Sequence, residues 1–210
     1  MNSGKEFEKA WKDSWDKTGN WFIRLIDSVK WGTGAGASFT PSNPCDCVGY
    51  APPILFVLEL KSTNGTGISF NAKDPLSKPD NEKTQVMIKS GQCKSLLKFN
   101  EKNGVVSGFV FNFRPRILKT KSEPNETFFV FIDDFMKFAR ESEKSSISRE
   151  DCHKFGVIIN GEVKKINYKY DIESFIDNAT TRLFNTKPEL RITFLQGLQE
   201  FINKNKEKGD

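Results

Sequence analysis

The stretch CDCVGYAPPILFVLELKS, residues 45–62, predicts two β-strands separated by a turn at a Pro-Pro pair. The second strand is apolar until Glu59, and Lys61 follows two positions later. Because alternate side chains of a strand point to the same face, Glu59 and Lys61 project together. A hairpin, or any adjacent pairing of the two strands, would also bring Asp46 close to Glu59. The stretch therefore predicts two carboxylates and one ammonium on one face of a sheet.

This group of side chains has the composition of a divalent-metal site. Proteins hold Mg2+ with one or two carboxylates and leave its other positions to water and phosphate, so Asp46 and Glu59 are candidate ligands. Lys61 would lie beside the metal, where an ammonium orients or activates an attacking water and stabilises charge on a phosphate. Glu8, at the edge of the first predicted helix's apolar stripe, would need such a partner if it faced inward. A Glu-x-Lys pair alone is also common as a solvated pair.

Regular elements surround this stretch on both sides. A helix is predicted from Ser3, which forms a capping box with Glu6, and Trp11 and Trp15 lie on its apolar stripe. Together the elements predict the α/β class, with a central mixed sheet flanked by helices. They are strands at 21–27, 45–50, 54–60, 105–113 and 127–132, a partner strand within 64–72, loops at 32–44 and 73–84, helices at about 85–100, 133–141 and 171–184, a hairpin or a strand with its return within 154–168, and a last helix from Pro188.

The composition fits one globular core. The chain has 210 residues, 37% of them hydrophobic, and a net charge of +5 with a pI of about 8.9, which is compatible with a polyanionic partner. It contains no apolar run long enough to cross a bilayer, and its first residues carry charges where a signal peptide is apolar. We therefore expect a cytoplasmic protein. Its cysteines lack the paired spacing of a zinc site and are expected to be reduced and mostly buried: Cys45, Cys47, Cys93 and Cys152.

The order of these motifs resembles a known family of nucleases. An aspartate, then Glu-x-Lys on the next strand, behind a helix with Gly-x-x-x-Glu, resembles the PD-(D/E)xK nuclease superfamily. More closely, the chain resembles the RecU family of Holliday junction resolvases. The resemblance covers residues 3–176, so we expect a RecU-like nuclease domain at 1–176 and a C-terminal helical extension at 177–210. The segments that carry it are GKEFEKAW, CDCVGY…LELKS, SGQCKSLLKFNEKNGVVSGFVFNF, FFVFIDDFMKF and YDIESFI.

The resemblance implies a restriction-endonuclease-like fold and a homodimeric endonuclease that resolves four-way DNA junctions by paired nicks in recombination and repair. It implies Mg2+ as cofactor, with Mn2+ as a substitute. Asp46 and Glu59 match the family's metal ligands, and Lys61, Glu8 and Gln92 match its catalytic residues, with Gln85 as a rival for the glutamine. The sequence departs from the family at Pro44, where the family has threonine, and at 32–44, which is shorter than the family's protruding stalk. The second departure bears on junction selectivity.

Several residues are candidates for DNA contact. Trp31, beside the glycine-rich loop, could stack on a base, whereas Trp11 and Trp15 fit core positions. The basic segment FRPRILKTK either neutralises phosphates or forms a solvated turn, and its candidates are Arg114, Arg116, Lys119 and Lys121. Two alternatives remain: a less selective restriction- or repair-type nuclease, and a catalytically inactive DNA-junction-binding protein. The joint presence of Glu8, Asp46, Glu59 and Lys61 argues against the inactive protein.

Overall fold

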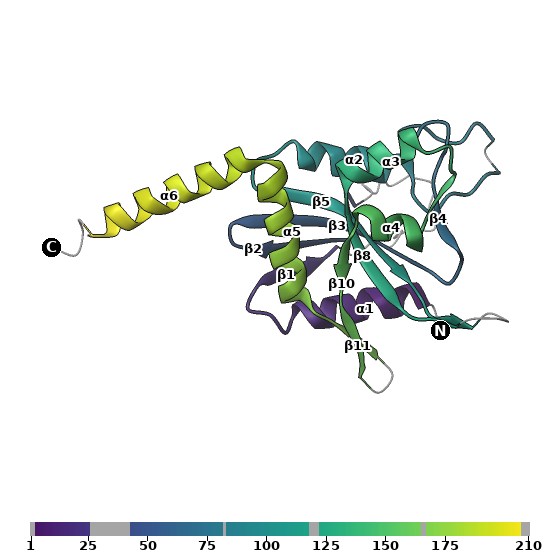
Figure 1. The fold of residues 1–210 in the computed structure, drawn as a ribbon, viewed down its shortest axis with the longest axis horizontal. Coiled ribbons are helices and arrows are strands. Elements are labelled where there is room, and N and C mark those ends of the chain that lie inside the picture. The colour runs from purple at the N-terminus through teal and green to yellow at the C-terminus, as the bar shows by residue number, and fades with distance from the viewer. Residues whose placement is uncertain (1–2, 26–42, 82, 118–121, 165–166, 207–210) are drawn as a thin grey trace, which may run out of the picture.

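A six-stranded sheet forms the centre of the protein in a computed structural model (Figure 1). The strands lie in the order β1-β2-β3-β5-β8-β10; β3 and β5 are parallel, and the other neighbours are antiparallel. Their bounds are β1 (Trp21–Arg24), β2 (Cys47–Ala51), β3 (Ile54–Thr63), β5 (Val105–Phe113), β8 (Glu126–Phe131) and β10 (Val157–Ile159). The structure describes all residues except 1–2, 26–42, 82, 118–121, 165–166 and 207–210.

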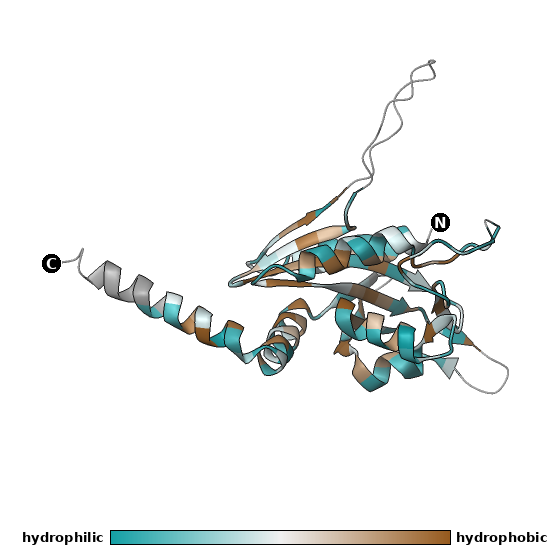
Figure 2. Cartoon of the chain, turned by 90° about the horizontal axis from the view of Figure 1, so that it is seen from above, coloured by the Kyte–Doolittle hydropathy of each residue, from teal (hydrophilic) through white to brown (hydrophobic). Residues whose placement is uncertain are grey.

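Helices cover both faces of this sheet (Figure 1). One face packs against α1 (Ser3–Trp15) and α5 (Ile172–Thr186), and the other against α2 (Ser90–Asn100), α3 (Ile132–Glu141) and α4 (Arg149–Phe155). A last helix, α6 (Pro188–Lys206), extends away from this body in both ribbon views (Figures 1 and 2). The α/β class and the central mixed sheet flanked by helices are confirmed. Three two-stranded sheets pair β4 (Gly67–Ser69) with β9 (Ser146–Ser148), β6 (Arg116–Ile117) with β7 (Ser122–Glu123), and β11 (Gly161–Lys164) with β12 (Asn167–Tyr170).

Strand β3 divides the core into two clusters. Phe56 and Leu58 pack with α1 and α5, whereas Val57 points to the α2 side, as the alternation of a strand requires. The predicted stripe of α1 is buried in the first cluster, where Trp11 and Trp15 have no exposed surface. In Figure 2 the central strands carry apolar stretches, and the helices alternate between apolar and polar segments. The two clusters fix the sheet between its helices, so each strand residue has a defined face.

The helix predicted over 85–100 begins later than expected. Met87 and Ile88 lie outside it because their backbone N–H groups donate to Ser69 of β4, to its hydroxyl and its carbonyl respectively. This pairing leaves Gln85 outside the helix, whereas Gln92 lies in its first turn. The prediction for 85–89 was therefore wrong, and of the two rival glutamines Gln92 is the one on the helix.

Two further elements differ from the sequence prediction. The strand expected within 64–72 forms as β4, but it pairs with β9, and Ile68 lies opposite Ile147 in the second core cluster. Helix α4 was not predicted. It begins after Ser148, whose hydroxyl accepts a hydrogen bond from the Asp151 N–H at 3.2 Å while the Asp151 carboxylate accepts one from the Ser148 N–H at 3.1 Å.

The predicted start of the C-terminal extension, residue 177, lies within α5. Helix α5 continues through that position, and its residues Ala179 and Leu183 are buried in the first core cluster. The described part of α6 from Arg191 to Gly197 is exposed. The division into domains at residues 1–176 and 177–210 stays a prediction. Among the described residues, no helix combines the length and the apolar character needed to cross a membrane.

Candidate active site

The pairing of β2 with β3 positions Asp46 against Glu59. Cys47 lies opposite Leu58 in the antiparallel register, and the Asp46 N–H continues the ladder to the Leu58 carbonyl at 3.1 Å. One carboxylate oxygen of Asp46 accepts a hydrogen bond from the Leu60 N–H at 2.7 Å, which holds the side chain against β3. The Asp46 carboxylate is near enough to Glu59 to help raise its pKa. The predicted proximity of the two carboxyl groups is confirmed.

Glu59 is held from two sides. It is only 3% exposed, and its Oε1 atom accepts a hydrogen bond from Lys61 Nζ at 2.9 Å and another from Gln92 Nε2. The Gln92 carbonyl oxygen in turn accepts from the Lys89 N–H at 2.9 Å, which fixes the direction of the amide. Strand β3 and the first turn of α2 therefore place one carboxylate, one ammonium and one amide together.

Burial raises the pKa of Glu59 from 4.5 to about 7. The Lys61 ammonium opposes this rise, and the negative charge of Asp46 adds to it. Two neighbouring carboxylates, of which Glu59 is buried and Asp46 partly buried, cannot both ionise cheaply unless a cation compensates them. The single ammonium of Lys61 does not suffice to keep the pKa of Glu59 in its ordinary range.

This donor set fits a divalent cation of the magnesium type. Mg2+ prefers carboxylate oxygens, and one or two of them suffice when water and a phosphate supply the rest. A second positive charge beside Asp46 and Glu59 would also offset the repulsion that raises the Glu59 pKa. Among the described residues there is no group of three or more His, Cys, Asp or Glu side chains that could hold an ion. The carboxylate pair is the candidate metal site because of the chemistry of its two donors.

The neighbouring thiols do not join this donor set. Cys45 and Cys93 are buried and free, and burial raises the pKa of each to about 12. Both thiols are therefore protonated near neutral pH in the metal-free protein, and a cation of the magnesium type prefers oxygen ligands to sulfur. All four cysteines are free and buried, as the sequence predicts.

One ion pair defines the position of Glu8. The residue projects from α1 and forms this ion pair with Arg24 of β1. The hydrogen bonds and ion pairs found within the described chain do not connect Glu8 to Asp46, Glu59 or Lys61. The partner that the sequence analysis required for Glu8 is thus an arginine.

The predicted DNA-contact residues fall in two groups. Trp31, Lys119 and Lys121 lie outside the described residues. Arg116 forms an ion pair with Glu123 across the β6–β7 pair. Arg114 follows β5, its backbone N–H donates to the Thr63 carbonyl at 2.8 Å, and its Nε atom is buried without a hydrogen-bond partner among the described residues. None of these contacts assigns the basic segment to DNA.

A curated protein shows which family contains this chain. The chain is 30% identical over 182 residues to the SPbeta prophage-derived uncharacterized protein YotM of Bacillus subtilis (strain 168), and the match covers 80% of this chain and 82% of that protein. The chain belongs to the YotM family. No family model matches the sequence.

A solved structure resembles the fold more distantly. The match is to Hjc, a Holliday junction resolvase of Archaeoglobus fulgidus, with a TM-score of 0.42 and 18% identity, over 74% of this chain and 95% of that chain. A TM-score of this size carries no inference about activity. The chemistry proposed for this member of the YotM family rests on its own residues.

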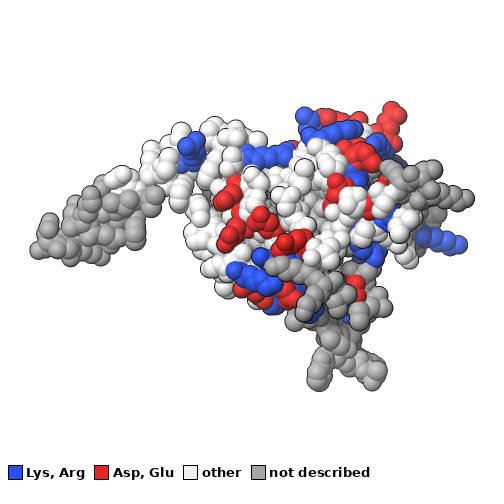
Figure 3. All heavy atoms as spheres, turned by 60° about the horizontal axis from the view of Figure 1, so that its bottom comes forward, with Lys and Arg blue, Asp and Glu red and all other residues white. Residues whose placement is uncertain are grey.

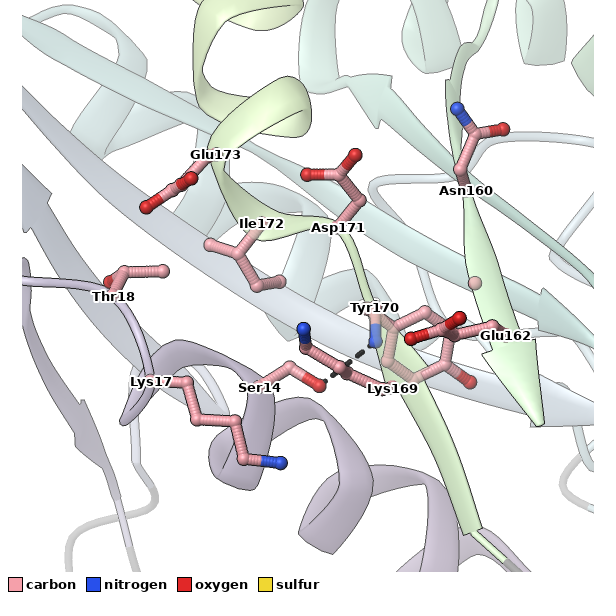
Figure 4. Close-up of a pocket in the computed structure, with 11 residues that line it drawn as sticks. Ser14, Lys17, Thr18, Asn160, Glu162, Lys169, Tyr170, Asp171, Ile172 and Glu173 are labelled. Atoms are coloured by element: carbon pink, nitrogen blue, oxygen red, sulfur yellow. Dashed lines mark hydrogen bonds between the residues drawn. The ribbon is translucent and has the colours of Figure 1, made fainter. Parts of the chain in front are cut away.

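A cavity lies away from the carboxylate pair, at the junction of α1, β12 and α5 (Figure 4). It has a volume of about 500 Å3, and Ser14 at its base accepts a hydrogen bond from the Tyr170 N–H at 2.9 Å. Its rim mixes Lys17 and Lys169 with acidic side chains such as Glu173. None of the predicted site residues lines this cavity, so its size does not make it the candidate active site.

The shifted Glu59 pKa predicts how stability depends on pH in the absence of divalent cations. Between pH 4.5 and 7 the unfolded chain has released the Glu59 proton, whereas the folded protein still holds it. The free energy of unfolding therefore falls as pH rises through this window, by on the order of 3 kcal/mol for this group. Glu59→Gln carries no such proton and should lack this part of the decline. Urea denaturation in EDTA at pH 5, 6, 7 and 8 measures this decline in the free energy of unfolding for both proteins.

The matched control is Glu101→Gln, at an exposed glutamate just after α2. It should follow the wild-type pH dependence. Equal slopes for the wild type and Glu59→Gln between pH 5 and 7 would contradict the raised pKa.

Proposed function

We propose that this chain is a Mg2+-dependent endodeoxyribonuclease of the PD-(D/E)xK type that resolves four-way DNA junctions. The observation that carries the proposal is the buried Glu59, which faces Asp46 and accepts a hydrogen bond from Lys61 on the same strand. This is the arrangement that the resemblance to RecU resolvases implies for a metal site with a catalytic lysine. Mn2+ is expected to substitute for Mg2+ because it accepts the same oxygen ligands.

Each residue of the candidate site has a separate role in the proposed hydrolysis of a phosphodiester. Asp46 and Glu59 would hold the metal, which when bound polarises the scissile phosphate and lowers the pKa of an attacking water. Lys61 is held at 2.9 Å from Glu59 with part of its side chain exposed, so its ammonium can stabilise the negative charge that develops on the phosphate. Gln92 fixes the orientation of Glu59 through its amide. We assign Glu8 a supporting role, since its ion pair joins α1 to β1 at the edge of the sheet.

The proposed nuclease function also implies a substrate and partners. We propose that the enzyme acts on branched DNA as a homodimer in the cytoplasm, because a dimer presents two sites for paired nicks in recombination and repair. Trp31, Arg114, Arg116, Lys119 and Lys121 stay proposed DNA contacts. The prophage origin of YotM makes recombining phage DNA a reasonable setting for this chain.

Cleavage of a synthetic four-way junction tests the proposal. The purified protein is incubated with a labelled junction, and with a linear duplex of the same arm sequences, in Mg2+ or in EDTA. We expect paired nicks in the junction, an intact duplex, and no product in EDTA.

Other results of this assay would change the proposal in defined ways. Cleavage of both substrates would indicate a less selective restriction- or repair-type nuclease. Junction binding without cleavage in Mg2+ or Mn2+ would indicate a catalytically inactive junction-binding protein. The absence of both binding and cleavage would contradict a role on DNA.

A further inference from the structure

Strands β1 and β2 expose a pair of aromatic side chains. Trp21 is 55% exposed and Tyr50 is 42% exposed, and the two residues lie directly opposite each other in the antiparallel pairing. Ile23, 42% exposed, is the next residue on the same face of β1. Directly opposed strand residues have Cβ atoms about 5 Å apart, so the two rings are neighbours. Neighbouring exposed aromatic side chains are a feature of surfaces that contact another molecule.

This aromatic surface faces away from α1. Phe22, between Trp21 and Ile23, stacks on Trp15 of α1 with ring centroids 5.2 Å apart, so the residues on either side of Phe22 point to the opposite face. Strand β2 shows the same alternation, because Gly49 lies against the Trp15 ring. A Cβ atom at Gly49 would come within 2.6 Å of that ring, which fixes this face of β2 towards α1. Tyr50, the next residue, therefore points away from α1.

The aromatic pair and the carboxylate pair share one face of the sheet. Val48 of β2 and Val57 of β3 pack in the core cluster on the α2 side, and Tyr50 and Glu59 each lie two residues further along these strands. Four residues of extended strand separate Asp46 from Tyr50 by about 13 Å. Stacked nucleotides advance about 3.4 Å each. A DNA strand whose phosphate lies at the carboxylates would thus reach the aromatic pair within a few nucleotides.

Positive charge lies next to this face. Helix α2 packs on the same side of β3 and β5, and residues 89–102, which contain it, carry exposed lysines at 89, 94, 98 and 102 against a single glutamate, Glu101. Figure 3, which brings the lower side of the view in Figure 1 forward, shows lysines and arginines together with aspartates and glutamates on that face. The surface beside the aromatic pair therefore matches a polyanion that offers flat apolar groups. DNA with unstacked bases has this chemistry.

We propose that Trp21 and Tyr50 form a base-stacking platform for an unpaired strand of DNA that extends from the carboxylate site. Lys94 and Lys98 neutralise the phosphates of this strand along α2. The inference rests on the proposed nuclease function and assigns that site a preference for substrates with unstacked nucleotides, such as the centre of a branched junction. Both rings accept any base, because every base has a stacking face.

Binding by a double variant tests this inference. Trp21→Ala/Tyr50→Ala is compared with the wild type in EDTA, where cleavage cannot occur, by fluorescence anisotropy with a labelled single strand, a four-way junction and a linear duplex. We expect at least about tenfold weaker binding of the single strand and the junction, and less than about threefold change for the duplex. Ile158→Ala, at a 51% exposed residue of β10 on the opposite edge of the sheet, is the matched control and should bind all three like the wild type.

The outcomes separate this inference from the proposed function. Equal single-strand binding by the double variant and the wild type would overturn the stacking platform while leaving the nuclease intact. A wild type that binds none of the three DNAs would overturn the proposed function itself. Sedimentation is measured on the same proteins. A dimer that becomes a monomer in the double variant, with unchanged DNA affinity per subunit, would assign the surface to a second copy of the chain and overturn the inference.

Discussion

Asp46→Asn is expected to reduce Mg2+-dependent cleavage of a four-way junction by at least about 1000-fold. The substitution leaves Glu59 as the single carboxylate of the pair, and metal catalysis of phosphoryl chemistry stabilises the transition state by several kcal/mol, of which each 1.36 kcal/mol is tenfold in rate. Single-turnover cleavage with excess enzyme measures the chemical step, and anisotropy in EDTA measures binding. We expect binding within about threefold of the wild type.

The fold should survive this substitution. Asparagine retains an oxygen that can accept the hydrogen bond from the Leu60 N–H, which the Asp46 carboxylate accepts at 2.7 Å. Removal of the negative charge also relieves Glu59, whose pKa that charge helps to raise. Asp13→Asn, at a half-buried aspartate of α1 paired with Lys9, is the matched control and should cleave at the wild-type rate. Cleavage by Asp46→Asn within about threefold of the wild type would contradict its role as a metal ligand.

Trp15→Ala is expected to lower the free energy of unfolding by about 4 kcal/mol. The Trp15 side chain has no exposed surface and lies between α1 and the sheet, where it stacks on Phe22 and contacts Phe56 and Phe175 edge-on. Alanine would leave a cavity that the surrounding aromatic rings cannot close without moving. Urea denaturation with far-UV circular dichroism measures the loss.

Trp21→Ala provides the comparison within the same chain. Trp21 is 55% exposed, so its removal should cost less than about 1 kcal/mol. The two tryptophans differ in burial and not in residue type, so the difference between the variants isolates the packing of the α1 side of the core. A cost of less than about 1 kcal/mol for Trp15→Ala would contradict the position of α1 on the sheet.

The sequence predicts the carboxylate pair because its geometry is local. Residues two apart on a strand share a face whatever the rest of the fold does, which places Glu59 with Lys61. A short turn between two strands strongly favours their antiparallel pairing, which places Asp46 beside Glu59. The raised pKa of Glu59 is less local, since it depends on α2 and the loop before it closing over β3. That closure brings the Gln92 amide into contact with Glu59, and it depends on contacts between residues more than thirty positions apart in the sequence.

Other features depend on contacts that a sequence pattern does not display. The ion pair of Glu8 with Arg24 joins α1 to the edge strand β1, and no sequence pattern around either residue predicts this pairing. The late start of α2 reflects the pairing of Met87 and Ile88 with β4, a tertiary constraint that overrides helix propensity. Helix α4 could have been predicted, because Ser148 and Asp151 form a readable Ser-x-x-Asp start.

The central claim is that Asp46 and Glu59 together hold a divalent cation. Isothermal titration of the metal-free protein with Mn2+ at pH 8 tests it most directly, with Asp46→Asn and Glu59→Gln titrated in parallel. We predict saturable binding by the wild type and its loss in both single variants, because each removes one of the two carboxylates. Equal Mn2+ binding by the wild type and both variants would contradict the claim, as would a wild type that binds no Mn2+.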